Sequence, residues 1–161
     1  MEIYLLRHGI AEDGRPGLRD ADRALTPEGR DKLKRVLKRA KGAGVDPDVI
    51  LSSPYRRALE TADVAAASLG YRGQIVQTKA LIPNASPHDV WEEIRSRKNE
   101  PSLLLSSHEP LMSSALALLL GNPALQVDMK KAALARVDCD SFGPEPRGIL
   151  KWLLTPATAG E

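Results

Sequence analysis

Two histidines and two arginines stand where they could do chemistry together. Arg7 and His8 directly follow the apolar run "EIYLL", Arg57 follows "VILSSPYR", and His108 follows "SLLLSS". A guanidinium group matches the paired oxygens of a phosphoryl group and stays charged at any working pH. An imidazole can attack phosphorus, act as a base or donate as a cation. If the chain brings these groups together, they could stabilise a transferring phosphoryl group.

Each of these residues also has an ordinary structural interpretation. Arg7 and His8 could simply close a strand, His108 could be a hydrogen-bonded corner histidine, and Arg57 could be solvated like Arg56 beside it. A metal site fits less well, because neighbouring arginines oppose a dication and no His, Asp or Glu cluster has ligand spacing. The glycine-rich nucleotide-binding motifs are also missing from the sequence. The two histidines and the two arginines share a position after apolar strands. This makes a phosphoryl site, with no metal and no cofactor, the better explanation.

The hydrophobic pattern predicts strands alternating with helices. Short apolar runs indicate strands, and stripes at i, i+3, i+4 and i+7 indicate helices. We expect strands over 2–7, 48–52, 73–78 and 102–107, helices over 27–41, 55–69, 87–98 and 110–120, and a terminal hairpin of 132–139 and 147–154. The segment 10–25 is predicted to be a loop, and the last residues, 155–161, a frayed tail.

This alternation predicts an α/β fold: a three-layer α/β/α sandwich with a mostly parallel sheet and an antiparallel C-terminal strand. We expect one domain spanning residues 1–161. Ligands of such sheets bind beyond the carboxyl ends of the strands, where the arginines and histidines above would gather. Prolines near four helix starts, with Thr26, Ser53 and Ser86 as N-caps, support the placement of the helices.

Composition excludes several classes of function. The net charge of +2 is too small to imply nucleic-acid binding, and the single cysteine, Cys139, can form no intrachain disulfide. No signal peptide or membrane-spanning run is recognisable, so we expect a cytoplasmic protein with no membrane partner. The sequence does not determine the oligomeric state, and a monomer is the default expectation. His88 is expected at the surface.

The basic run "KLKRVLKRAK" lies in the first predicted helix. Its apolar stripe is intact, so we interpret the lysines and arginines as the solvated face of that helix. The alternative is a docking surface for an acidic partner protein.

The chain resembles the histidine phosphatase superfamily. "LLRHG" resembles its R-H-G motif, "SSPYRRALETA" its S-P-x-x-R-x-x-x-T-A segment, "RALTPEG" the L-T-x-x-G entry to its first helix, and "LLLSSHEP" its late strand-end histidine. The motifs occur in the family's order and span most of the chain. The resemblance implies the phosphoglycerate-mutase-like fold of that family.

The resemblance also implies a role for each matched residue. His8 is the nucleophile that becomes a phosphohistidine intermediate, and Arg7 binds the phosphoryl oxygens beside it. Arg57, rather than Arg56, matches the motif arginine, and His108 donates to the phosphoryl group. Gly9 allows the close approach of the phosphoryl group, since no Cβ blocks it.

The closest resemblance is to the short SixA-type phosphohistidine phosphatases of bacteria. The mutase branch follows R-H-G with a Thr and an Asn that are absent from "IAEDG", and its usual general-acid glutamate is not evident. An imidazole leaving group that is protonated on its free nitrogen needs no dedicated acid, whereas an alkoxide usually does. We therefore expect a phosphohistidine phosphatase.

Glu12 and Glu109 remain candidate acids. Glu109 is also expected to favour the N-terminus of the following helix. The partner that we expect is a phosphorylated protein, such as a histidine phosphotransfer domain. The alternatives are a phosphatase acting on small phosphorylated molecules and a non-enzymatic phosphate or phosphohistidine reader.

Overall fold

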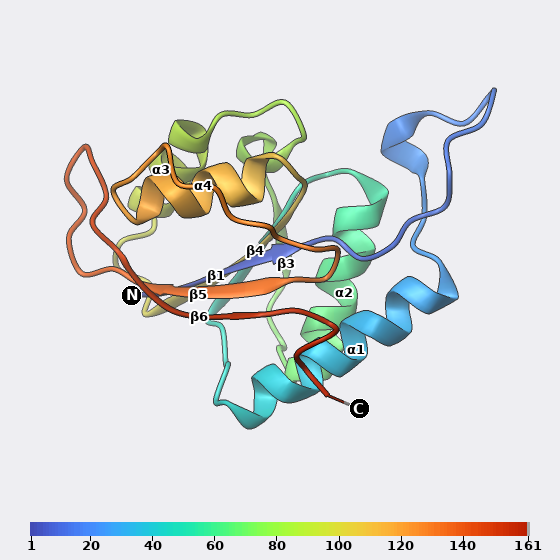
Figure 1. Cartoon of the computed structure of the whole chain (residues 1–161), viewed down its shortest axis with the longest axis horizontal. Helices are drawn as coiled ribbons and strands as arrows, with labels where there is room; N and C mark the ends of the chain where they lie inside the picture. Colours follow the sequence, from blue (N-terminus) through green and yellow to red (C-terminus); the bar gives the residue numbers. More distant parts are fainter. Residues whose placement is uncertain (161) are drawn as a thin grey trace.

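A computed structural model describes residues 1–160 and contains the predicted alternation of strands and helices (Figure 1). In chain order the elements are β1 (Glu2–Arg7), η1 (Asp20–Asp22), α1 (Pro27–Gly42), β2 (Val49–Ser52), α2 (Arg56–Leu69), β3 (Ile75–Gln77), η2 (Lys79–Leu81), α3 (Pro87–Arg95), β4 (Ser102–Ser107), α4 (Leu111–Leu119), β5 (Leu134–Asp138) and β6 (Ile149–Leu154). Every predicted strand and helix is present. The predicted loop contains the short 3₁₀ helix η1, and the third helix ends three residues earlier than predicted.

Within residues 1–160 the strands form one six-stranded sheet in the order β3-β2-β4-β1-β5-β6. Strands β3, β2, β4 and β1 are parallel, while β5 pairs antiparallel with both β1 and β6. In the register, Arg7 lies opposite Ser107, and Ser52 lies opposite Ser106. The carboxyl ends of β1, β2 and β4 therefore meet at one edge of the sheet, which confirms the predicted mixed α/β architecture.

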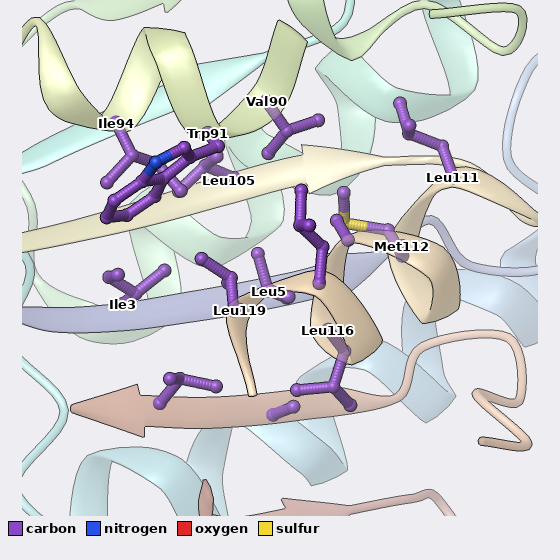
Figure 2. Packing of buried hydrophobic residues seen from close by; sticks show 14 of the residues in the cluster. Ile3, Leu5, Val90, Trp91, Ile94, Leu105, Leu111, Met112, Leu116 and Leu119 are labelled. Atoms are coloured by element: carbon purple, nitrogen blue, oxygen red, sulfur yellow. The ribbon is translucent and has the colours of Figure 1, made fainter. Parts of the chain in front are cut away.

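The helices cover the two faces of this sheet in pairs. Alternate residues of β1 point to opposite faces: Ile3 and Leu5 join one buried cluster, and Tyr4 and Leu6 join the other. Helices α3 and α4 pack on the first face, where Trp91 lies among aliphatic side chains (Figure 2). Helices α1 and α2 pack on the second face (Figure 1). The result is the expected three-layer sandwich.

Two of the three predicted N-caps are confirmed. The Thr26 side chain accepts a hydrogen bond from the Gly29 amide at the start of α1. Ser86 forms a reciprocal capping box with Asp89 at the start of α3. The third prediction is wrong, because α2 begins at Arg56 and its N-cap residue makes no side-chain cap. The hydroxyl of Ser53, the serine predicted to cap α2, lies instead against an imidazole of the neighbouring strand end.

The C-terminal segment also differs from its prediction as a frayed tail. The side chains and backbones of Thr155 and Thr158 exchange hydrogen bonds, which fold this segment into a turn. Ala159 packs against the cluster beneath α1. The segment therefore forms a wall beside α1. Among residues 1–160, no helix combines the length and the apolar character needed to cross a membrane.

Candidate active site

The two strand-end histidines lie against each other at the carboxyl edge of the sheet. His8 follows β1 and His108 follows β4, and the backbone N–H of His8 donates to the Ser107 carbonyl at 2.9 Å. Their ring centroids are 5.3 Å apart in an edge-to-face arrangement. Both side chains are buried. The parallel pairing of β1 with β4 therefore brings together two imidazoles that are far apart in the chain.

A single hydrogen bond defines the tautomer of His8. Nδ1 lies 2.7 Å from the carbonyl oxygen of Gly9. A carbonyl only accepts hydrogen bonds, so Nδ1 carries the proton of the neutral ring. The lone pair of the neutral imidazole is then on Nε2, which is the atom that can act as a nucleophile.

Burial keeps both imidazoles neutral. The pKa of His8 is lowered from 6.5 to about 4, chiefly by burial and also by the charges of Arg57 and Arg7, while the hydrogen bond to the Gly9 carbonyl acts in the opposite direction. The pKa of His108 is lowered to about 3, again chiefly by burial and then by its neighbour His8. Near neutral pH the site thus holds two uncharged imidazoles beside permanent cations.

Ser53 holds His108 from the adjacent strand. Its hydroxyl oxygen lies 2.8 Å from Nε2 of His108 and accepts a hydrogen bond from the Tyr55 amide at 3.2 Å. Because the serine proton has no other acceptor among residues 1–160, we assign it to Nε2. This assignment places the ring proton of neutral His108 on Nδ1, a buried atom without a partner in that same part of the chain. The Tyr55 ring packs edge-on against His108, with centroids 5.2 Å apart.

Arg7 reaches the site from the last position of β1. Its Nη1 donates to the carbonyl of Met129 at 2.8 Å, and within residues 1–160 its buried Nε makes no hydrogen bond. Burial lowers the pKa of Arg7 from its usual value. The negative charges of Glu109 and Asp128 partly offset this lowering. The guanidinium is thus oriented by the backbone and keeps donor capacity for a ligand.

The structure separates the two consecutive arginines of α2. Arg57 is buried, and both its terminal nitrogens contact Asp20: Nη1 donates to the backbone carbonyl at 2.8 Å and Nη2 to the carboxylate at 3.1 Å. Its guanidinium carbon also lies 5.2 Å from the centre of the Tyr55 ring. Arg56 is exposed and pairs with Glu60 on its own helix. Only Arg57 therefore belongs to the histidine cluster.

Helix α1 packs closely against Gly9. A Cβ atom at Gly9 would lie 2.8 Å from Cδ1 of Leu33 and 3.1 Å from the Gly29 carbonyl oxygen. Its amide donates to Thr61 Oγ1 at 3.2 Å, and that hydroxyl donates to the Arg57 carbonyl at 2.7 Å. Thr61 thus joins the end of β1 to the first turn of α2. A part for Gly9 in phosphate binding stays a prediction.

The other candidate residues lie apart from the histidine pair or are otherwise engaged. Glu12 accepts hydrogen bonds from the Ala24 amide and from Arg15, which hold its pKa below the usual range. Glu109 accepts from the Ser113 amide at 2.7 Å, so its expected role at the start of α4 is confirmed. His88 is exposed on α3, as expected. Among residues 1–160, no three His, Cys, Asp or Glu side chains are grouped to hold a metal ion.

Sequence reasoning misses three contacts of the site. Ser53 is predicted as a helix cap, although its partner is His108, and its position between a strand end and a proline is the only signal. Thr61 lies inside the family's S-P-x-x-R-x-x-x-T-A segment, where the sequence alone assigns it no role. Asp20 is the partner of Arg57 from the long loop, and nothing in the local sequence marks it.

Comparison with known protein families identifies the pattern. The family model of branch 1 of the histidine phosphatase superfamily matches residues 3–82. A Picosynechococcus protein of uncharacterized function is 35% identical over 136 residues, which cover 83% of this chain and 82% of that relative. The phosphohistidine phosphatase SixA of Escherichia coli is 27% identical over 158 residues, covering 97% of this chain and 94% of that protein.

Among solved structures, the protein histidine phosphatase SixA complexed with tungstate is similar throughout. The TM-score is 0.85 at 26% sequence identity, and the match covers 98% of each chain. The likeness therefore includes the terminal hairpin as well as the strands that position the two histidines.

Proposed function

Because the chain is a phosphatase of the histidine phosphatase superfamily, we propose that it transfers the phosphoryl group of its substrate to His8 and then to water. Arg7, Arg57 and His108 bind the phosphoryl group in this proposal. The substrate that we propose is phosphohistidine on a protein, with a histidine phosphotransfer domain as the partner.

The observation that carries the proposal is the state of His8. Its Nδ1 proton is committed to the Gly9 carbonyl, and its pKa of about 4 leaves Nε2 unprotonated near neutral pH. A neutral imidazole with an oriented lone pair is a competent nucleophile without a separate base. Two guanidinium groups beside it offset the negative charge of the phosphoryl oxygens.

In the first step, Nε2 of His8 donates its lone pair to phosphorus. The substrate imidazole enters with a proton on its other ring nitrogen. The bond between phosphorus and the leaving nitrogen breaks, that nitrogen keeps the electron pair, and the substrate imidazole departs as a neutral ring. The hydrogen bond from Nδ1 to Gly9 stabilises the positive charge that develops on His8. We assign the unpaired Nδ1 proton of His108 to a phosphoryl oxygen.

In the second step, water attacks the phosphorus of the phosphohistidine intermediate. The bond to Nε2 breaks, its electron pair returns to His8, and the proton lost by water leaves with the phosphate or the solvent. The permanent charges of Arg7 and Arg57 serve both steps, because neither guanidinium exchanges a proton near neutral pH.

The choice of phosphohistidine rests on the carboxylates. Glu12 accepts hydrogen bonds from the Ala24 amide and from Arg15, which lower its pKa, and Glu109 accepts a hydrogen bond from the Ser113 amide of α4, so we assign neither of them the role of general acid. An imidazole leaving group that is protonated on its other ring nitrogen does not need a proton from such an acid, whereas general acids contribute on the order of 100- to 10,000-fold with poorer leaving groups. Similarity to the phosphohistidine phosphatase SixA, and to the structure of the protein histidine phosphatase SixA, supports the same choice.

Trapping of the intermediate tests the nucleophile. Wild-type protein is mixed briefly with a radiolabelled, phosphorylated phosphotransfer domain and quenched in alkali. We expect acid-labile label on the wild type and on His88→Asn, the matched surface-histidine control, and none on His8→Asn. Label that persists on His8→Asn would refute the assignment of His8.

A comparison of substrates tests the specificity. We expect faster hydrolysis of the phosphorylated phosphotransfer domain than of an unactivated alkyl phosphate. Good turnover of the alkyl phosphate, without hydrolysis of the phosphoprotein, would instead establish a phosphatase of small molecules.

A further inference from the structure

A hollow of about 740 Å³ opens beside Arg7, and Arg57 is not among the residues that line it. Basic side chains from two separate segments surround it: Lys32 and Arg35 from α1, and Lys130 and Lys131 from the segment that precedes β5. The rest of its lining is mostly apolar: Ile10, Ala132, Pro156 and Ala157, with Thr155 and Gly160. The hollow thus has a mostly apolar surface edged by cations, and it reaches Arg7, the arginine that we propose binds the phosphoryl group.

A second hollow of about 410 Å³ continues along α1. It shares Arg35 with the first and adds Lys38 and Arg39, while Ala159 of the folded C-terminal segment lies on its other side. Figure 1 shows that segment running beside α1. We call the two hollows together the basic groove, bounded by the basic face of α1, the segment 130–132 and the segment 155–160.

The cations of the groove are incompletely neutralised. Lys32 pairs with Glu28, and Lys130 pairs with Asp128. Among residues 1–160, the side chains of Arg35, Lys38 and Lys131 make no ion pair, and no acidic residue lines either hollow. A groove that holds unpaired cations over an apolar surface attracts an anionic ligand that also has apolar atoms to bury.

The length of the groove favours a polypeptide over a small anion. From Lys32 to Arg39, α1 advances about seven residues, which is about 10 Å along its axis. An extended peptide advances about 3.3 Å per residue, so roughly three residues span this part of the groove alone. A single phosphate or carboxylate group would contact only one end of it.

We propose that the basic groove binds an acidic polypeptide segment of the substrate protein, next to the phosphorylated histidine that enters the site. The inference rests on the proposed function for the phosphorylated residue, but the charge and shape of the groove carry it independently. It extends the role of the basic α1 face from a solvated surface to a docking surface. The groove would then select among phosphoproteins, while the histidine pair performs the same chemistry on each.

Chemically phosphorylated peptides test this proposal. One peptide carries a phosphohistidine among neutral residues. Two others add a run of glutamates either before or after the phosphohistidine, and their twins carry glutamines there. We expect kcat/KM of the wild type to be on the order of tenfold higher for at least one acidic peptide than for its glutamine twin, through a lower KM, because several exposed ion pairs act together.

The variant that tests the groove is Arg35→Glu with Lys38→Glu. Its matched control is Arg72→Glu with Lys98→Glu, an equal change of charge at exposed positions outside the groove. The acidic-to-neutral ratio of kcat/KM should fall to about one in the groove variant and remain on the order of tenfold in the control. A wild-type ratio near one, or equal losses in both variants, would overturn the proposal.

Binding of an unphosphorylated acidic peptide separates the two proposals. Its affinity is measured by fluorescence anisotropy with a labelled glutamate-run peptide. If the wild type hydrolyses no phosphohistidine peptide but binds this probe, and the groove variant does not, the proposed substrate fails and the groove stands. Absence of binding to the wild type would overturn the groove, whatever the activity.

Discussion

Acidification should destabilise this protein through His8, and a single substitution can isolate the effect. His8 has a pKa of about 4 in the folded chain, whereas an exposed histidine has 6.5. The unfolded chain therefore binds a proton first as the pH falls, and the free energy of unfolding decreases from about pH 6.5 downward. The contribution of neutral His8 to the free energy of unfolding is fully present above about pH 6.5, and it is completely lost below the pKa of His8 in the folded chain.

The magnitude follows from the separation of the two pKa values. Their difference is about 2.5 units, or roughly 3 kcal/mol at 1.36 kcal/mol per unit, once the pH is below both. At about pH 5, the pH is roughly 1.5 units below the pKa of the unfolded chain, which corresponds to a loss of about 2 kcal/mol. Replacement by asparagine removes the titration and keeps an amide N–H for the Gly9 carbonyl.

Urea unfolding, followed by the fluorescence of Trp91 and Trp152, measures this loss. The wild type should lose about 2 kcal/mol more than His8→Asn between about pH 7.5 and pH 5. Carboxylates, His88 and His108 are present in both chains, so the difference between the chains reports His8 together with its effect on the pKa of His108. Equal losses in the two chains would refute the argument that burial holds His8 neutral.

Three further substitutions test contacts of the site. Arg57→Ala should lower kcat/KM by on the order of 100-fold or more in steady-state assays, as removal of one charge-stabilising donor does elsewhere, while Arg56→Ala stays within a few-fold. Gly29→Ala should destabilise the fold by about 2 kcal/mol in urea unfolding, because its Cβ would meet a backbone carbonyl just beyond the end of β1. Ser53→Ala should lower kcat by on the order of tenfold, because buried Nε2 of His108 loses its partner.

Each of these expectations has a contrary result. Equal losses for the two arginines would mean that the motif does not distinguish Arg57 from Arg56. Wild-type stability in Gly29→Ala, with the open position Gly14→Ala as control, would contradict the close packing of α1. An unchanged kcat in Ser53→Ala would mean that its hydroxyl does not position His108.

The elements of the fold are predictable because their signals are local. An apolar run followed by charged residues marks the end of β1, and Thr26 and Ser86 with their prolines mark two helix starts. The alternation of strands and helices then implies parallel strands whose carboxyl ends share an edge. These local signals are enough to place His8 and His108 at the same end of the sheet.

Other features depend on contacts between distant segments. Ser53 resembles a helix cap, and only the pairing of β2 with β4 makes it the partner of His108. Asp20 lies in a loop without a motif, and the position of that loop over α2 brings it to Arg57. The close packing of α1 against Gly9 is likewise a contact between segments that are distant in the sequence.

The sequence by itself determined which groups the strands of this protein carry at their carboxyl ends, because hydrophobic period and capping are properties of neighbouring residues. Only the tertiary structure decided the protonation state of the histidines, because burial and nearby charge come from packing. It also decided that the C-terminal segment lies beside α1 and forms the basic groove. A shifted pKa and a groove both depend on residues that are close in space and far apart in the chain, so no local sequence pattern predicts them.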